Sequence, residues 1–448
     1  MNIKAMNTPA MNTPAMNTPA MNTPAMNAPA MNARGTVHVV GAGIAGLAAA
    51  VLLASRGARV SLHEAAGHGG GRCRSFHDEV LGRTFDNGNH LVLAGNRAVM
   101  KFLDLIGGRD TLAGPADASF AFADLRTGER WSLRPNAGRL PWWIFSRSRR
   151  APGTTAGDYL AVLRLARADA RATVADRINV GRPAFARFWE PMVLAVLNAD
   201  AHEAAARLLW PVMTEIFGRG AQAARPLIAA KGLSRSFVEP ALRFLESRGA
   251  TIRFNHRLRA VERQGEHVHA LEFVRTRHDI AKADRVVLAV PPASMAELLP
   301  EISTPRGSRA IVNGHFLVKA PLPADLPFLG LIGGTAHWLF IRGDIVSVTV
   351  SAADALAEVA NDEIARRLWA DIACALSLPA APLPPWRIVK EKRATFAQIP
   401  EELPRRAKTA TPWRNLFLAG DWTDTGLPCT IEGAARSGFA AAEGALGG

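Results

Sequence analysis

The alternation of short apolar runs and an alanine-rich segment predicts a βαβ unit at residues 36–64. Residues 36–40 form a β-branched run that is typical of a buried strand. A glycine-rich turn at 41–46 leads into residues 47–56, whose alanines and leucines predict a helix. Gly57 ends that helix, and residues 58–63 predict a second strand.

The glycines of this turn have the spacing of a dinucleotide-binding site. Gly41 allows a sharp turn off the strand, and Gly43 has no side chain to keep a pyrophosphate away from the backbone. Gly46 allows the helix to pack closely on the strand. The free N–H groups at the helix start, which includes Ile44 and Ala45, are expected to face the phosphates.

The residues after the second strand favour FAD over a nicotinamide cofactor as the bound nucleotide. Glu64 lies about twenty positions after the first glycine, where a carboxylate can accept both hydroxyls of an adenosine ribose. A glycine run ending at Gly71 follows, and with Arg72 and Arg74 it can wrap a second side of a pyrophosphate. The alternative is a solvated loop. Flavoproteins that hold FAD tightly often have such an extension, which nicotinamide dehydrogenases do not need.

The remaining pattern predicts an α/β protein with a discontinuous Rossmann-type FAD-binding domain and a mixed α+β substrate domain. Helices are expected at 97–105, 238–247 and 354–376, and a mainly helical insert at 155–225. Strands are expected at 120–125, 131–133, 250–254, 258–261, 268–274, 285–290, 311–318, 329–332, 338–342, 345–350 and 415–419. The FAD-binding domain is predicted to comprise three separate segments (36–105, 231–298 and 408–448), and the substrate domain a mainly helical insert (106–230) and a β-rich segment (299–407), all preceded by a repeat extension (1–35).

Composition restricts the compartment and the partners. The 448 residues suffice for two domains, and no apolar run approaches the length that crosses a bilayer. The three cysteines form no close pair, which favours the cytoplasm and argues against a zinc site or any other metal centre. A net charge of +14 attracts anionic surfaces, and because no nucleic-acid module is recognisable, a membrane surface is favoured over nucleic acid.

Two further stretches suggest a membrane contact and an extension at the start of the chain. Residues 140–145 combine leucine, proline and three aromatic rings, and Arg147, Arg149 and Arg150 follow at once. This order suits a peripheral membrane contact, although a core turn beside a solvated arginine run is an equal alternative. Residues 1–35 repeat the unit Met-Asn-Thr-Pro-Ala, whose prolines forbid a helix, and we expect a disordered extension or a start assigned too early.

The closing segment predicts a strand, a turn and the start of a helix. An apolar strand ends at Gly420 and Asp421, and a helix begins near Thr430 and Ile431. The N-terminus of that helix can stabilise negative charge on a reduced flavin.

Together these motifs resemble the flavin amine oxidase and phytoene desaturase superfamily, whose first signature ends in a Gly-Gly-Arg-x-x-Ser stretch. The resemblance implies an amine-oxidase-like fold and a flavin-side stretch that includes Asn87, Gly88 and His90. It also implies a backbone contact from Leu258 to the adenine. The closing segment matches the second flavin signature of this superfamily, which implies that Asp421 approaches the pyrophosphate or the ribityl chain.

A narrower resemblance covers nearly all of residues 36–448. It is carried by 86–93, 189–198, 338–342, 420–423 and 427–428, and it is to the FAD-dependent hydroxysqualene dehydroxylases of bacterial hopanoid synthesis. One departure is Asn89, where glutamine is expected. The resemblance implies hydride transfer from reduced FAD to hydroxysqualene, a long-chain isoprenoid, as its allylic hydroxyl leaves to give squalene.

Two residues are candidates for the acid that protonates the departing oxygen. His90 is the first because it is polar and adjoins the flavin stretch, and Glu190 is the second. A hydrogen bond that orients the cofactor is the alternative role for His90, and a helix start or surface position is the alternative for Glu190. Only one dinucleotide motif is present, so no separate NADPH-binding domain is predicted. We therefore expect FAD to be reduced by direct encounter with NADPH or by a redox protein.

Three other functions are compatible with some of these features. Amine oxidation usually uses aromatic rings before the flavin, whereas Tyr159 is the only tyrosine and residues 427–429 lack an aromatic ring, so it is disfavoured. A carotenoid or phytoene-type FAD desaturase would share the fold and stays open. So does a non-catalytic, membrane-docked flavin-binding subunit.

Overall fold

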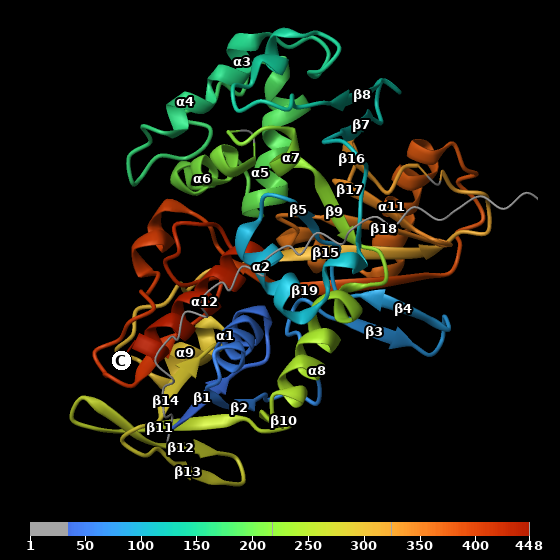
Figure 1. Cartoon of the computed structure of the whole chain (residues 1–448). Coiled ribbons are helices and arrows are strands. Elements are labelled where there is room, and N and C mark those ends of the chain that lie inside the picture. Colours follow the sequence, from blue (N-terminus) through green and yellow to red (C-terminus); the bar gives the residue numbers. More distant parts are fainter. Residues whose placement is uncertain (1–34, 217, 324, 448) are drawn as a thin grey trace, which may run out of the picture.

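A computed structural model describes residues 35–216, 218–323 and 325–447 of the chain (Figure 1). The predicted disordered extension at 1–35 lies outside the described residues except for Gly35. Within the described ranges, no helix combines the length and the apolar composition needed to cross a bilayer.

The first sheet has five parallel strands within the described residues and contains the predicted βαβ unit. Its order is β10 (Thr251–Arg253), β2 (Arg59–His63), β1 (Thr36–Val40), β14 (Arg285–Leu288) and β20 (Leu416–Leu418). The predicted strands in these four separate stretches of the chain are therefore confirmed. Because the strands run parallel, their carboxyl ends meet at one edge, where a nucleotide binds in such sheets.

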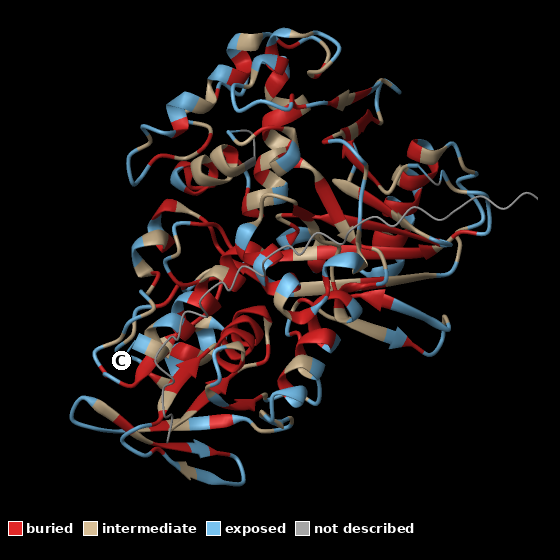
Figure 2. Ribbon diagram, in the orientation of Figure 1, coloured by how far each residue is buried: buried red, intermediate tan, exposed pale blue. Residues whose placement is uncertain are grey.

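Helix α1 (Ile44–Ser55) is the centre of this layer. Its residues from Ile44 to Ala54 are all buried, and Figure 2 shows the helix almost entirely in red. It packs against the sheet and against three further helices: α2 (Arg97–Ile106), α8 (Glu239–Ser247) and α12 (Ile431–Gly447). A helix that is covered on every side needs apolar residues all round, which explains the alanine and leucine run at 47–54.

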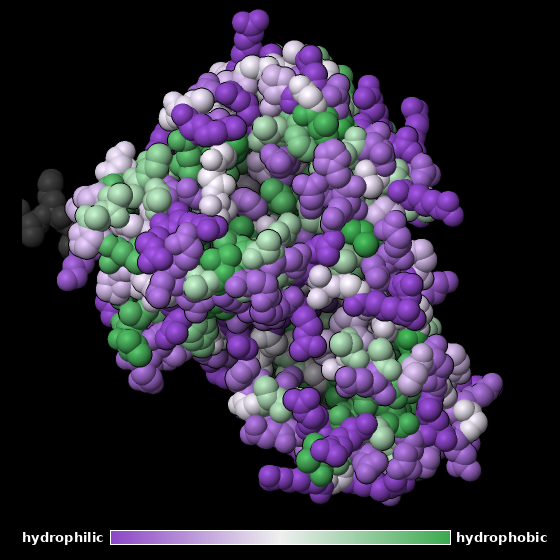
Figure 3. Space-filling model, turned by 180° about the vertical axis from the view of Figure 1, so that it is seen from behind, coloured by the Kyte–Doolittle hydropathy of each residue, from purple (hydrophilic) through white to green (hydrophobic). Residues whose placement is uncertain are grey.

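The second large sheet has seven strands in the described part of the chain. Its order is β19 (Trp386–Phe396), β15 (Ser308–Leu317), β18 (Ile345–Val350), β17 (Trp338–Arg342), β16 (Phe328–Ile332), β7 (Phe120–Asp124) and β8 (Arg130–Leu133). Helices α10 (Asp354–Ala357) and α11 (Asn361–Leu376) follow β18, and α11 packs on β15 and β19. Polar purple residues cover much of the face drawn in Figure 3, with hydrophobic residues in separate green patches.

One strand of this region was not predicted, and one predicted helix is divided. Strand β19 was not expected, because the charged run 390–393 hides its alternation. The single helix predicted at 354–376 is two helices, because Ala360 has an extended backbone with ψ of 143°. Asp362 and Glu363 then lie in the first turn of α11, where the helix dipole favours acids.

Short helices gather at the top of Figure 1, above the five-stranded sheet and beside strands β7 and β8. They are η2 (Trp142–Phe145), α3 (Ala156–Leu160), α4 (Val162–Leu165), η3 (Phe185–Trp189), α5 (Glu190–Leu197), α6 (Ala206–Ile216) and α7 (Ala221–Ala224). Smaller elements complete the description: β3 (Ser75–Asp78) with β4 (Arg83–Asp86); β5 (Leu91–Leu93), β6 (Leu112–Ala113) and β9 (Pro226–Ala229); η1 (Arg109–Thr111); η4 (Ser234–Val238); β11 (Leu258–Gln264), β12 (His267–Phe273) and β13 (Arg277–Asp279); α9 (Pro292–Leu298); and η5 (Pro400–Arg405).

Candidate functional site

The turn between β1 and α1 leaves room for a ligand. A Cβ atom added to Gly43, the N-cap residue of α1, would meet nothing within 4 Å. No side chain caps the helix, so the first-turn N–H groups, which include those of Ile44 and Ala45, can bind an anion. The glycine run lies against this turn, because Gly70 N donates to Ala42 O at 2.7 Å. Gly71 follows directly, so two glycine segments border the same space.

Gly46 fixes how closely helix and strand approach. A Cβ atom at Gly46 would lie 1.8 Å from the carbonyl oxygen of Gly41, so any larger residue would push α1 away from the end of β1. Gly41 is held in turn by β2, since its N–H donates to His63 O at 2.7 Å. The close packing expected from sequence is therefore present.

Glu64 points back toward the same turn. Its Oε2 accepts the N–H of Ala42 at 2.7 Å, and its Oε1 accepts that of Ala66 at 2.8 Å. Each carboxylate oxygen keeps a further lone pair, so the group can still accept ribose hydroxyls. The open space at Gly43, the uncapped helix start and this carboxylate fit an adenosine pyrophosphate.

A row of imidazoles lies behind Glu64. His63 Nδ1 is 3.0 Å from His256 Nδ1, and His256 N donates to Glu64 O at 2.8 Å. Burial lowers the pKa of His63 to about 2, so this ring is neutral near pH 7. Leu258 begins β11 two residues after His256, and its backbone contact with the adenine stays a prediction.

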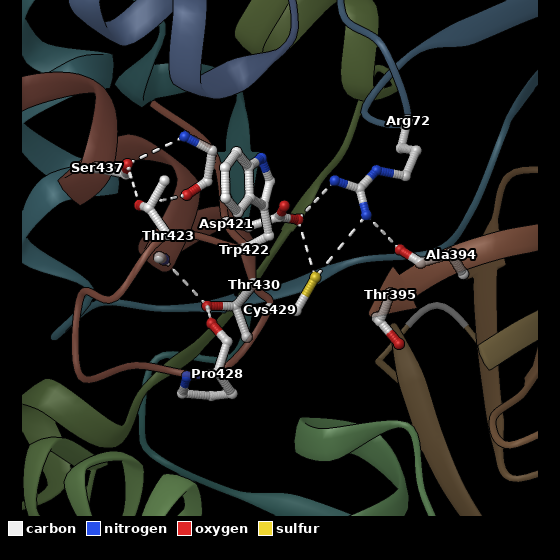
Figure 4. A network of polar contacts seen from close by, with 12 residues as sticks. Arg72, Ala394, Thr395, Asp421, Trp422, Thr423, Pro428, Cys429, Thr430 and Ser437 are labelled. Carbon is white, nitrogen blue, oxygen red and sulfur yellow. Dashed lines mark hydrogen bonds and ion pairs between the residues drawn. The ribbon is translucent and has the colours of Figure 1, made fainter. Parts of the chain in front are cut away.

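Arg72 joins the two ends of the chain (Figure 4). Its Nη2 lies 2.6 Å from Oδ2 of Asp421, and its Nη1 donates to the carbonyl oxygen of Ala394. The Asp421 carboxylate raises the pKa of the Arg72 guanidinium. The guanidinium is thus directed at the closing segment, and a direct contact of Arg72 with pyrophosphate stays a prediction.

The closing segment is fixed around Asp421. Cys429 donates its S–H to Asp421 Oδ2 at 2.9 Å, and burial raises the pKa of this thiol, which keeps it protonated. Gly420 N donates to Ser437 Oγ at 3.0 Å, which ties the turn to α12. Thr430 Oγ1 accepts the N–H of Gly433 at 3.1 Å, so Thr430 caps α12, whose first residue is Ile431.

The stretch 87–90 connects this site to the seven-stranded sheet. Asn87 Nδ2 donates to Arg72 O at 3.4 Å, and Asn313 Nδ2 of β15 donates to Asn87 O at 3.3 Å. Gly88 follows Asn87 in the chain and precedes His90 by two positions. Burial lowers the pKa of His90 to about 4, so its imidazole is neutral near pH 7.

Glu190 lies on a different element from the flavin-side residues. It is the first residue of α5, and burial together with the charge of Asp200 raises its pKa. The other charge that acts on it is that of Arg126. Neither Asp200 nor Arg126 belongs to the β1–α1 turn or to the 420–431 segment.

Several residues of this site carried no signal in the sequence. The Ala394 carbonyl, Thr395 and Gln398 come from β19 and the residues after it, and the strand itself was not predicted. Gln398 Oε1 accepts the N–H of Cys429 at 2.7 Å, and its Nε2 donates to Leu197 O at 2.7 Å. One buried amide thus links the end of α5 to the segment that precedes α12.

Tyr159 is a structural residue of the helical layer. Its hydroxyl accepts the N–H of Ala151 at 2.9 Å, and its ring packs against Trp143 and Phe188. It therefore does not supply an aromatic ring beside Asp421 and Cys429.

Comparison with known proteins agrees with this geometry. Residues 44–446 match the family described as flavin containing amine oxidoreductase. The chain is 46% identical over 411 residues to a hydroxysqualene dehydroxylase of Rhodopseudomonas palustris, covering 91% of this chain and 97% of that protein. It is 44% identical to a hydroxysqualene dehydroxylase of Sinorhizobium fredii, covering 92% of this chain and 98% of that protein. The solved structure of cyclohexylamine oxidase from Brevibacterium oxydans superposes with a TM-score of 0.67 at 15% identity, covering 92% of this chain and 98% of that chain.

The chain therefore belongs to the flavin containing amine oxidoreductases, and the predicted amine-oxidase-like fold and FAD cofactor are confirmed. Within this family it groups with the curated hydroxysqualene dehydroxylases, at 41% to 46% identity. The individual contacts predicted for each site residue stay predictions.

Replacing Glu64 with alanine should weaken FAD binding by about tenfold or more, because a ribose would lose its acceptor. The amides of Ala42 and Ala66 would lose theirs as well. Flavin absorbance retained after gel filtration, and titration of the apoprotein with FAD, measure the effect. Glu79→Ala is the matched control, since the Glu79 side chain is 91% exposed. A Glu64→Ala protein that stays as yellow as the wild type would contradict the assignment.

Proposed function

We propose that this protein removes the hydroxyl group of hydroxysqualene reductively and releases squalene. The proposal rests on the 46% identity with a hydroxysqualene dehydroxylase across 91% of the chain. In the overall reaction the allylic C–O bond breaks, a C–H bond forms, and the oxygen leaves as water. When bound, reduced FAD supplies the hydride.

One row of residues crosses the seven-stranded sheet and supports this choice of substrate. The strand registers place Asn313 opposite Thr349, Thr349 opposite Trp338, Trp338 opposite Gly330, Gly330 opposite Phe122, and Phe122 opposite Trp131. Directly opposed residues share one face of a sheet. The row therefore changes from polar at β15 and β18 to aromatic at β17, β7 and β8.

The polar end of the row lies at the flavin-side stretch. Asn89 Nδ2 donates to Thr349 Oγ1 at 3.1 Å, and Thr349 Oγ1 donates to Asn313 Oδ1 at 2.7 Å. The aromatic end continues from there: the rings of Phe122 and Trp131 stack at 5.8 Å, and Trp338 meets Phe122 at 5.4 Å. An oxygen-bearing carbon near the flavin with a long hydrocarbon chain beyond it matches this order, since ring faces pack on alkenes and stabilise nearby positive charge.

The proton for the departing oxygen comes from His90 or Glu190 in this proposal. Burial lowers the pKa of His90, which leaves its imidazole neutral and a weak donor. Burial raises the pKa of Glu190, the direction expected of a carboxyl group that acts as an acid. The directions of the two shifts therefore favour Glu190, whereas the position beside the flavin-side stretch favours His90. FAD is reduced by NADPH or by a redox protein.

Anaerobic incubation of the photoreduced holoenzyme with hydroxysqualene tests the proposal. We expect squalene to form in proportion to the flavin reoxidised, and oxidised enzyme without reductant to form none. Turnover of phytoene by the oxidised enzyme, with no squalene from the reduced one, would instead identify a desaturase. Failure of both reactions in flavin-loaded protein would leave the non-catalytic flavin-binding role.

We also propose that the protein is cytoplasmic and contacts a membrane through residues 140–150. Leu140, Trp142 and Phe145 are 78%, 55% and 66% exposed, respectively. Trp143 and Ile144, which lie between Trp142 and Phe145 in the chain, are buried. The alternative of a core turn therefore applies to these two residues. The guanidinium of Arg149 lies 5.5 Å from the Trp142 ring, which joins an exposed ring to the basic run. An anionic lipid surface suits this combination.

Changing Leu140, Trp142 and Phe145 together to serine should reduce cosedimentation with anionic liposomes several-fold at low salt, because these side chains supply the apolar contact. Val80→Ser with Val274→Ser is the matched control, since both valines are exposed elsewhere on the chain. Raising the salt concentration should weaken wild-type binding through screening of the arginines. Sedimentation equal to that of the control variant would remove the membrane proposal.

A further inference from the structure

Thr395 presents a hydroxyl group whose hydrogen has no acceptor within the described residues. The side chain lies at the end of β19, next to Ala394, whose carbonyl oxygen accepts Arg72 (Figure 4). Thr395 is 7% exposed, and its Oγ1 accepts a hydrogen bond from Asn198 Nδ2 at 3.0 Å. A hydroxyl that accepts one hydrogen bond can still donate its own hydrogen. A buried hydroxyl hydrogen without an acceptor makes the folded protein less stable, and a ligand that supplies an acceptor removes this cost.

Asn198 is held so that its N–H₂ group must face Thr395. Its Oδ1 accepts the backbone N–H of Ala352 at 2.7 Å, and a backbone N–H can only donate, which fixes the orientation of the amide. Asn198 is buried and ends α5 with φ of +49°, a left-handed conformation that asparagine adopts more readily than most residues. The direction of the hydrogen bond to Thr395 is therefore set by the end of α5.

This hydroxyl adjoins an apolar region on one side, whereas Arg309 of β15 lies opposite Thr395 across the strand pair. Leu197 and Phe396, the chain neighbours of Asn198 and Thr395, belong to the hydrophobic core cluster shared with Phe328 and Trp338. The Gln398 amide accepts the N–H of Cys429 and donates one hydrogen to Leu197 O, and Asn198 donates one amide hydrogen to Thr395. The Thr395 hydroxyl is the one O–H donor among these three side chains, and its hydrogen has no acceptor in the described residues. One free O–H at the edge of an apolar region matches a ligand with one oxygen on a long hydrocarbon chain.

We propose that Thr395 donates a hydrogen bond to the hydroxyl oxygen of the substrate, with Asn198 as its positioning residue. This inference rests on the function proposed above and assigns the group that distinguishes the substrate from its product. Threonine binds and orients the leaving oxygen here, and the proton comes from a stronger acid. After the reaction squalene offers no acceptor, the Thr395 hydroxyl loses its partner, and release of the product is favoured.

Binding of hydroxysqualene and of squalene to the oxidised holoenzyme tests the assignment, because no turnover occurs without reductant. Quenching of tryptophan fluorescence in detergent micelles reports both affinities, and the chain has 10 tryptophans. The wild type should bind hydroxysqualene about tenfold more tightly than squalene, which is the effect of one buried donor gaining an acceptor. Thr395→Val should lose this preference while its affinity for squalene stays within about twofold, and Thr395→Ser should restore it.

Asn198→Asp provides a second variant that keeps the threonine. An aspartate can still accept the N–H of Ala352, but it also accepts the Thr395 hydrogen, so the preference should fall as it does in Thr395→Val. Flavin absorbance confirms that each variant retains FAD.

Two outcomes would overturn the assignment. The first is a Thr395→Val or Asn198→Asp protein that keeps the wild-type preference, and the second is equal weakening of both ligands, which indicates a structural role. If the wild type still forms squalene, only this inference fails. A wild type that neither prefers hydroxysqualene nor converts it refutes the proposed function as well.

Discussion

The ion pair between Arg72 and Asp421 joins the two ends of the chain at the predicted cofactor site. Its partners are 349 positions apart, one just after the glycine run at the start of the chain and the other in the turn before the last helix. The Ala394 carbonyl and the Cys429 thiol complete the group, so β19 meets both ends at the same point. Removing one charge from such a partly buried pair leaves the other without its partner, which is more costly than exchanging both.

The stretch 86–90 connects this region to the seven-stranded sheet. Asp86 pairs with Arg342 of β17 and also accepts the N–H of Leu233 at 2.9 Å. Asn87 and Asn89 extend the contact to β15 and β18. The polar end of the cross-sheet row is thereby fixed against the flavin side, and the aromatic end lies farther from it. A substrate with one oxygen would be oriented by this asymmetry.

The elements that could be predicted from the sequence are those whose chemistry is local. The βαβ unit, Glu64 and the closing turn at 420–430 each carry their function within a few residues, so spacing alone indicated them. The burial of individual residues within a stretch could not be predicted from the sequence. Trp143 and Ile144 lie in the core while Leu140 and Trp142 are exposed, a distinction that depends on how η2 packs.

Contacts between distant segments were also out of reach. Asn198 and Thr395 are 197 positions apart. Their hydrogen bond depends on β19, a strand that was not predicted because its charged residues hide the alternation of apolar and polar positions. The partner of Arg72 could not be identified either, because a guanidinium in a glycine-rich loop suits a phosphate as well as a carboxylate. Periodicity and motif spacing report the local chain, whereas these pairings come from the tertiary fold.

A double-mutant cycle on FAD affinity tests most directly whether Arg72 and Asp421 close the site as a unit. The dissociation constant of FAD would be measured for the wild type, Arg72→Gln, Asp421→Asn and the double variant. The account predicts that each single change weakens binding and that the double variant binds no more weakly than the worse single one, because the same interaction is lost once. Independent effects that simply multiply, or single variants with wild-type affinity, would contradict it.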